Sequence, residues 1–101
     1  MESMSSREVT IGTDSTLISE EQTPPTKRNV LIITNTDRNA TGGVVYIDFG
    51  REAKVGEGVA LYPTGTWSET IDNRYNVTMS RISAVASLAN TTISIHERIE
   101  D

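Results

Sequence analysis

The sequence predicts an all-β protein: a small antiparallel β-sandwich or barrel of six to seven strands that carries an extended N-terminal arm. Three observations support this fold. Short segments rich in β-branched residues recur at intervals of about ten residues from Asn29 onward. Glycine and proline mark turns between many of these segments. The first 28 residues are polar by contrast, and they end just beyond the pair Pro24-Pro25.

The length of 101 residues fits a single domain with one appendage. We expect residues 1–28 to form the polar arm with its diproline linker, and residues 29–101 to form the β-sandwich domain. Proline lacks an amide donor and favours an extended conformation in the residue before it. The segment from Thr23 to Thr26 is therefore predicted to be a stiff connector. The β-domain is expected to fold without the arm.

Two short pieces of the arm, Glu8 to Ile11 and Ser15 to Ile18, alternate apolar and polar residues as β-strands do. Neither piece can bury enough apolar surface to become ordered alone. One interpretation is a disordered tail. The other is that the pieces add as strands to a sheet edge, on the same subunit or on the next. The predicted contact residues of the arm are Val9, Ile11, Leu17 and Ile18.

The body begins with two segments that have strong strand patterns. Residues 29–35 form a continuous aliphatic run, which predicts a strand that is central or buried on both faces. In residues 44–49 the side chains alternate between two faces. Val45, Ile47 and Phe49 share one face, and we expect that face to contact the core.

Only residues 80–89 allow a helical alternative, because four of their apolar residues have helical spacing. We favour a strand through Ala86, since the surrounding segments have a period of two. Residues 75–79 are predicted to be a strand joined to it or just before it. Residues 91–99 close the chain with the alternating pair Ile93 and Ile95.

The composition argues against several classes of partner. The net charge of −5 divides into −2 for residues 1–28 and −3 for residues 29–101, so neither part offers a basic stripe for direct nucleic-acid binding. The chain has no cysteine, which excludes disulfides and thiolate metal sites. No apolar run approaches the roughly 20 residues that span a bilayer. The first residues lack the basic and apolar regions of a secretion signal, so we expect a cytosolic protein before assembly.

Few residues suggest catalysis, and we predict that the protein is not an enzyme and has no cofactor and no metal site. His96 is the only histidine, and the strand alternation places it on the outward face. Asp48 and Asp72 could be imagined as a paired acid and base. Isolated carboxylates at strand ends, however, usually interact with solvent or cap turns.

All five aromatic residues lie within thirty positions of one another, which suggests a core, an interface anchor or a sugar-stacking platform. We expect Phe49 to be part of the core, and the pattern slightly favours the same for Trp67. Tyr62 and Trp67 are the predicted possible contacts with a partner. The remaining aromatic residues are Tyr46 and Tyr75.

Several motifs together resemble small structural proteins of tailed viruses. The first is an aliphatic strand that ends in Thr-Asn, at residues 29–35, followed by an aromatic strand that ends in Phe-Gly, at residues 45–50. A Gly-plus-aliphatic strand and a Pro-x-Gly turn follow at residues 58–68. Ile82-Ser83-Ala84 and the final strand from Thr92 to Glu97 also fit. The resemblance covers about Arg28 to Glu97, and the longer first hairpin and the arm depart from it.

The resemblance implies a virion component, most simply a capsid decoration or minor capsid protein. Such a protein would be made in the host cytoplasm, form a homo-oligomer, and bind the major capsid protein or other virion proteins through its β-domain and arm. The same resemblance also allows a head-tail connector or a tail or fibre component. A further alternative is a carbohydrate-binding β-sandwich module, in which Trp67 and the tyrosines would be exposed on one face.

Overall fold

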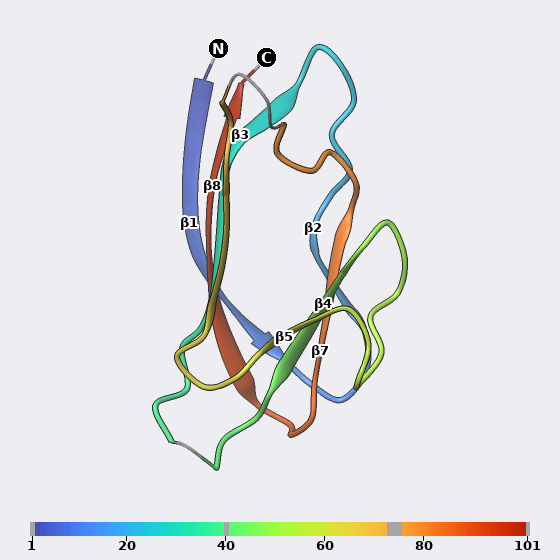
Figure 1. Ribbon diagram of the computed structural model, residues 1–101, viewed down its shortest axis with the longest axis vertical. Coiled ribbons are helices and arrows are strands. Elements are labelled where there is room, and N and C mark those ends of the chain that lie inside the picture. The colour runs from blue at the N-terminus through green and yellow to red at the C-terminus, as the bar shows by residue number, and fades with distance from the viewer. Residues whose placement is uncertain (1, 40, 73–75, 101) are drawn as a thin grey trace.

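A computed structural model describes residues 2–39, 41–72 and 76–100 of the chain, and within these ranges it confirms the all-β class. The described residues form two antiparallel sheets of four strands each and contain no helix. Figure 1 shows the sheets as two layers that face each other, with both ends of the chain at the same end of the sandwich. The strands are β1 (Glu2–Ile11), β2 (Thr16–Ser19), β3 (Lys27–Asn35), β4 (Val45–Phe49), β5 (Val59–Leu61), β6 (Thr66–Thr70), β7 (Ile82–Ala86) and β8 (Thr91–Glu100).

Consecutive strands often belong to different sheets, so the chain passes repeatedly from one layer to the other. The first sheet has the order β1-β8-β3-β6, and the second has the order β2-β7-β4-β5. The edge strands are therefore β1 and β6 in the first sheet, and β2 and β5 in the second. The two N-terminal strands thus lie at one edge of each sheet.

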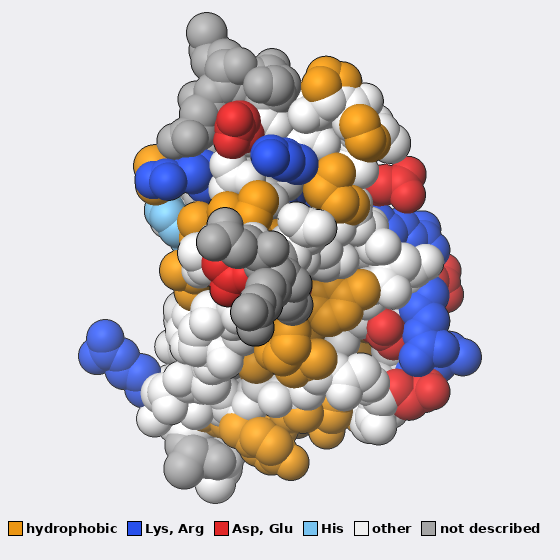
Figure 2. Space-filling model, turned by 45° about the horizontal axis from the view of Figure 1, so that its top comes forward, with side chains coloured by type: hydrophobic (Ala, Val, Ile, Leu, Met, Phe, Trp, Pro, Cys, Tyr) orange, Lys and Arg blue, Asp and Glu red, His pale blue; other side chains and the backbone are white. Residues whose placement is uncertain are grey.

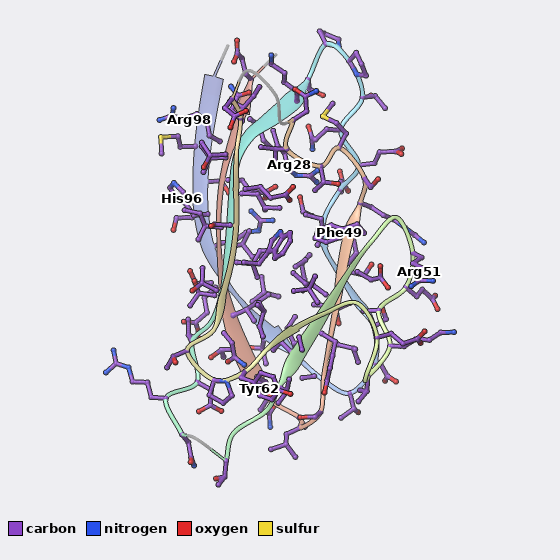
Figure 3. All side chains as sticks on the ribbon, viewed as in Figure 1. Arg28, Phe49, Arg51, Tyr62, His96 and Arg98 are labelled. Atoms are coloured by element: carbon purple, nitrogen blue, oxygen red, sulfur yellow. The ribbon has the colours of Figure 1, made fainter. Side chains whose placement is uncertain are left out.

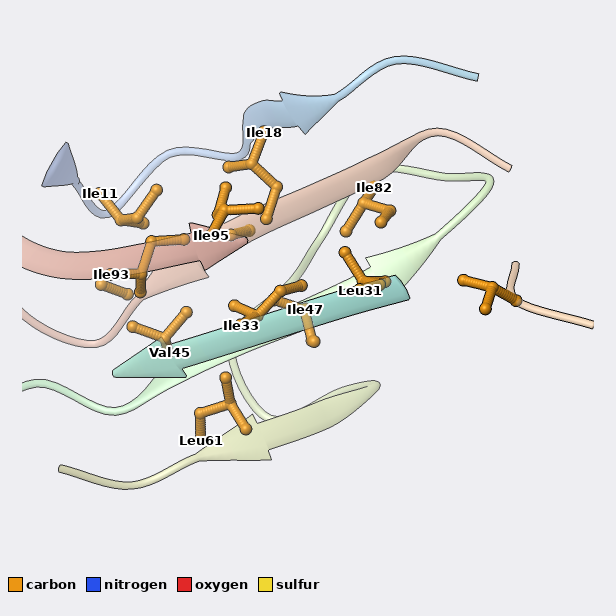
Figure 4. Close-up of a cluster of buried hydrophobic side chains, with 13 residues drawn as sticks. Ile11, Ile18, Leu31, Ile33, Val45, Ile47, Leu61, Ile82, Ile93 and Ile95 are labelled. Carbon is orange, nitrogen blue, oxygen red and sulfur yellow. The ribbon is translucent and has the colours of Figure 1, made fainter. Parts of the chain in front are cut away.

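The core fills the space between the sheets with aliphatic side chains from seven of these strands and from one loop residue (Figure 4). Alternation along β3 and β8 directs Leu31, Ile33, Ile93 and Ile95 inward, and all four are fully buried. The other members of the buried cluster are Ile11, Ile18, Val45, Ile47, Leu61, Val77, Ile82, Ala84 and Ala86.

Most of the strands predicted in the body are confirmed. β3 lies between β8 and β6, which agrees with the central position expected for residues 29–35. Val45 and Ile47 of β4 are fully buried, and Phe49 packs against the core from its margin. β7 is a strand and not a helix, and all five of its residues are buried. Residues 76–79 are not in a strand, and Tyr75 lies outside the described residues.

The N-terminal segment differs from the extended arm that the sequence predicts. β1 pairs with β8 along all ten of its residues, from Glu2 opposite Glu100 to Ile11 opposite Thr91. β2 pairs with β7 in the other sheet. The body thus receives one strand for each sheet from residues 2–19, which raises the strand count of the described residues from the expected six or seven to eight.

The physical reason for this difference is that strand addition is driven mainly by backbone hydrogen bonds, which any sequence can make. The sequence left open whether the two β-prone pieces form a disordered tail or add to a sheet edge, on this subunit or the next; in the structure they lie in edge strands of the same chain. The boundary predicted between residues 28 and 29 falls inside β3. The connector at residues 20–26 does interrupt strand pairing, as the diproline predicts.

Candidate functional site

The main concentration of polar side chains in the described structure is a buried ionic cluster between the two sheets. Arg28 of β3 and Glu97 of β8 form its centre, with side chains that are 0% and 2% exposed. Arg28 Nε donates to Glu97 Oε2 at 2.9 Å, and Ser19 Oγ of β2 donates to the same oxygen at 2.7 Å. Figure 3 shows Arg28 in the interior between the layers. The cluster therefore connects β2 of one sheet to β3 and β8 of the other.

A bulge in β3 explains why a charged residue points inward at this position. The register between β3 and β8 shifts between Arg28 and Val30, so that Arg28 and Asn29 are both buried. The other guanidinium nitrogens of Arg28 donate to Ser19 Oγ at 2.7 Å and to three backbone carbonyls. These carbonyls belong to Glu20 at 2.5 Å, Thr78 at 2.7 Å and Ser80 at 3.1 Å. The buried charge is thus fully bonded, as a buried charge must be.

Arg7 of β1 completes the cluster from the edge of the first sheet. Its Nη1 lies 2.9 Å from Glu97 Oε1, and its Nη2 donates to the carbonyl of Ile18 at 2.6 Å. The side chain of Arg7 is 38% exposed, so this ion pair is the part of the cluster that contacts solvent. Because Arg7 and Ser19 come from β1 and β2, the cluster fastens both N-terminal strands to the body.

The surroundings of Glu97 act on its pKa in opposite directions. Burial alone raises the pKa, because it disfavours the charged form. The hydrogen bonds from Ser19, Arg28 and Arg7, together with the charge of Arg7, outweigh burial and leave the pKa below its usual value. A carboxylate held in this way is a structural anion, with its oxygens already occupied by donors.

The lowered pKa of Glu97 predicts a loss of stability in acid. A group whose pKa is lower in the folded state stabilises the fold at every pH above its unfolded pKa, which for glutamate is about 4.3. That contribution is lost as the pH falls through the lowered pKa of the folded state. Urea denaturation at a series of pH values should show the free energy of unfolding decreasing below about pH 4.

The matched control for this effect is Glu97→Gln, which keeps the size of the side chain and removes its titration. The variant should be less stable at neutral pH and should lose most of the difference between neutral and acidic conditions. If wild type and Glu97→Gln lose stability in parallel as the pH falls, other carboxylates cause the acid sensitivity.

The structure separates the four predicted contact residues of the arm. Ile11 and Ile18 belong to the core of this chain, with exposed fractions of 0% and 5%. Val9 packs against that core from the margin. Leu17 points the other way and is 52% exposed. Of the four, Leu17 is thus the residue that is most available to a partner in the monomer.

Among the described aromatic residues, Tyr62 lies apart from Phe49 and Trp67. Phe49 and Trp67 both pack against the core, with ring centroids 6.0 Å apart and planes inclined at 44°. The indole nitrogen of Trp67 donates to Glu69 Oε2 at 3.3 Å. Tyr62 is 65% exposed and lies at the end of the sandwich opposite the chain termini (Figure 3). This separation argues against a flat sugar platform built from Trp67 and Tyr62.

The residues considered for catalysis are also apart from one another. His96 points away from the interior on the outer side of the first sheet (Figure 3). Asp48 is the second-last residue of β4, where it accepts from Arg51 Nε at 2.8 Å and from the backbone nitrogen of Phe49 at 2.9 Å. Asp72 is exposed beyond β6. Within the described residues, no group of three or more histidine or acidic side chains could hold a metal ion.

A hollow of about 240 Å³ lies beside the end of β4. Its lining carries charges of both signs, from Asp48, Arg51, Glu52, Lys54 and Glu57. Figure 2 likewise shows acidic and basic side chains mixed along one side of the visible face. The mixture provides no concentrated field for an anionic or a cationic ligand.

None of the residues of the ionic cluster was among the predicted site residues, although the sequence contains one signal that indicates Glu97. Ile93, Ile95 and Glu97 follow one alternation, so a strand that buries the first two must also direct Glu97 inward. Such a buried carboxylate requires a cationic partner. Arg28 could not be identified as that partner, because the bulge that turns it inward is not visible in the residue pattern.

Comparison with known proteins adds no identification: no protein-family model matches the chain, and no curated protein matches it significantly. Within the part of the chain that the structure describes, no helix is long and apolar enough to cross a membrane.

Proposed function

We propose that this chain is a structural protein of a tailed virus, either a capsid decoration protein or a minor capsid protein. It binds the shell and its neighbours through surfaces of the folded sandwich, and it has no catalytic role. The sequence motifs from Arg28 to Glu97 that resemble such proteins supply the starting point. The sandwich found for the described residues is compatible with that resemblance.

The observation that carries the proposal is where the charged side chains of the chain lie and what they bind. The buried charges of Arg28 and Glu97 are bonded to each other within the fold, and the hollow beside β4 is lined by charges of both signs. The remaining surface offers open strand edges and single exposed apolar side chains, which suit binding to other proteins. A sandwich held together by its own N-terminal strands is a rigid unit for attachment to a shell.

Two of the predicted contact residues are well placed for this role because they stay exposed. Leu17 is 52% exposed on the outer side of the second sheet, and Tyr62 is 65% exposed at one end of the sandwich. Exposed tyrosine is a frequent anchor at protein interfaces, because its ring buries a large area at a small cost in entropy. Trp67, by contrast, is occupied by Phe49 and Glu69 within the chain.

The proposal is tested on purified virions of the virus that encodes the chain. An antibody should detect the protein in virions assembled with the wild-type gene. Tyr62→Ser and Leu17→Ser should each reduce incorporation, and Tyr62→Ser should do so by roughly tenfold or more, as expected for an interface anchor. Leu88→Ser is the matched control, because Leu88 is also exposed, at 51%, but lies outside the predicted contacts.

A chain absent from wild-type virions would contradict the proposal as a whole. Normal incorporation of both variants would remove Leu17 and Tyr62 from the contact surface. The number of copies per particle distinguishes the alternative position at a head-tail connector or tail. A decoration protein occupies symmetry-related sites that recur over the whole shell, whereas a connector forms one small ring, so a decoration protein is present in far more copies.

A further inference from the structure

The outer edge of β1 is the longest and most regular of the four strand edges of the sandwich, although its Arg7 points inward. β1 is ten residues long and pairs with β8 without any shift in register. It contains no proline, no glycine and no lysine. The side chain of Arg7 points toward Glu97, on the face of the sheet that is turned to the core. Natural proteins usually protect such an edge, since its free backbone groups can bind a further strand.

The other three edges of the sandwich carry such protection, which makes the contrast informative. β5 has only three residues. β2 has four residues and an irregular register with β7. β6 has five residues and directs the charged side chain of Glu69 inward, where it is 7% exposed. Short strands, bulges and inward charges all hinder edge-to-edge pairing.

We propose that β1 pairs with β1 of a second copy of this chain, antiparallel and around a two-fold axis. The two four-stranded sheets would then form one continuous eight-stranded sheet, with β1 and its copy at the centre. A two-fold contact uses the same surface twice, so a strand must be complementary to itself. This pairing depends on β1 alone and holds whatever larger structure the protein joins.

The side chains of β1 select one register for this pairing. A two-fold axis perpendicular to the sheet keeps each side chain on its own face. Residues with even numbers lie on one face of β1 and residues with odd numbers on the other, so an even-numbered residue can only oppose an even-numbered one, and an odd-numbered residue an odd-numbered one. Only two such registers pair nine of the ten residues. With the axis at Arg7, two arginines would face each other, and like charges directly opposite are destabilising. With the axis at Ser6, two small neutral serines meet.

The register centred on Ser6 also brings opposite charges together. It places Met4 of one copy opposite Glu8 of the other. Arg98 lies opposite Met4 on the β8 side, and its Nη2 reaches the Met4 sulfur at 3.8 Å. The guanidinium therefore lies beside Met4, and the carboxylate of the second Glu8 would be added to the contacts that Arg98 already makes within its own chain. The two-fold axis repeats this contact, so charge complementarity supports a second copy of the chain as the partner.

The first test is the oligomeric state of the full chain, measured by sedimentation velocity over a range of concentrations. Wild type should form dimers that dissociate on dilution. Ser6→Lys places two like charges at the axis and should weaken dimerisation about fivefold or more. The matched control is Ser68→Lys, an exposed serine on the opposite edge of the same sheet, which should leave the dimer unchanged.

The second test uses the absence of cysteine from the natural chain. Directly opposed residues of an antiparallel pair have Cα atoms about 4.5–5.5 Å apart, a separation that a disulfide can bridge. Ser6→Cys should therefore form a cross-linked dimer on mild oxidation, and Ser68→Cys should not. A wild-type protein that stays monomeric, a dimer unaffected by Ser6→Lys, or equal cross-linking of both cysteine variants would overturn the proposal.

Discussion

A chain that lacks residues 1–20 is expected to be unfolded at room temperature. The deletion removes one of the two strands that pair with β8 and takes Ile11 and Ile18 out of the core. Truncating one buried isoleucine to alanine already costs about 2–5 kcal/mol. Two such losses, about 4–10 kcal/mol together, already approach the total stability of about 5–15 kcal/mol that is typical of a domain, and the backbone pairing of two strands is lost as well. Circular dichroism should show no cooperative thermal transition in the truncated protein.

Single substitutions in β2 provide the matched control for this deletion, because neighbouring residues point in opposite directions. Ile18→Ala should cost about 2–4 kcal/mol, whereas Leu17→Ala should cost less than about 1 kcal/mol, since Leu17 is half exposed. A truncated protein that melts cooperatively near the temperature of the full chain would show that residues 1–20 are dispensable. It would also restore the sequence-based expectation of a β-domain that folds without an arm.

Arg28→Met should destabilise the protein by about 3–5 kcal/mol. The substitution leaves the Glu97 carboxylate in the interior without its buried cation, and it removes donors from the carbonyls of Glu20, Thr78 and Ser80. Removal of the buried partner of a buried charge is among the most costly changes a fold can undergo, and here only the half-exposed Arg7 and the Ser19 hydroxyl would still bind Glu97. Urea denaturation at neutral pH, with the midpoint and the slope compared with wild type, measures the cost.

The comparison with Arg7→Met separates the effect of burial from the effect of charge. Both substitutions remove one positive charge bonded to Glu97, but the side chain of Arg7 is 38% exposed and that of Arg28 is fully buried. Arg7→Met should therefore cost only about 1 kcal/mol, as for partly exposed ion pairs. Equal costs for the two variants would mean that burial of Arg28 contributes nothing to the stability of the cluster.

The sequence predicted the fold class and most strands of the body because their side-chain alternation is strong. Leu31, Ile33, Ile93 and Ile95 lie where a period of two places them. The strand preferred for residues 82–86 is confirmed against its helical alternative. In these elements the local pattern and the tertiary structure favour the same conformation, so the residue pattern alone is sufficient to predict the strands.

The N-terminal segment and the ionic cluster could be predicted only in part. The pattern identified Glu8 to Ile11 and Ser15 to Ile18 as β-prone, but backbone pairing does not reveal which edge accepts a strand. Glu97 follows the inward alternation of β8, yet charged residues are so rarely buried that its residue type alone predicts an exposed position. Arg28 depends on a bulge, which adds one residue to a strand and reverses the faces locally.

Hydrogen exchange in the intact wild-type chain tests most directly whether the N-terminal segment belongs to the sandwich. Amide groups of β1 that bond to β8, and those of β2 that bond to β7, should exchange slowly, in the same class as the central amides of β3. This pattern would mean that residues 2–19 open only when the whole fold opens. Rapid exchange throughout residues 2–19, with protection confined to the body, would contradict the account and return the segment to a flexible arm.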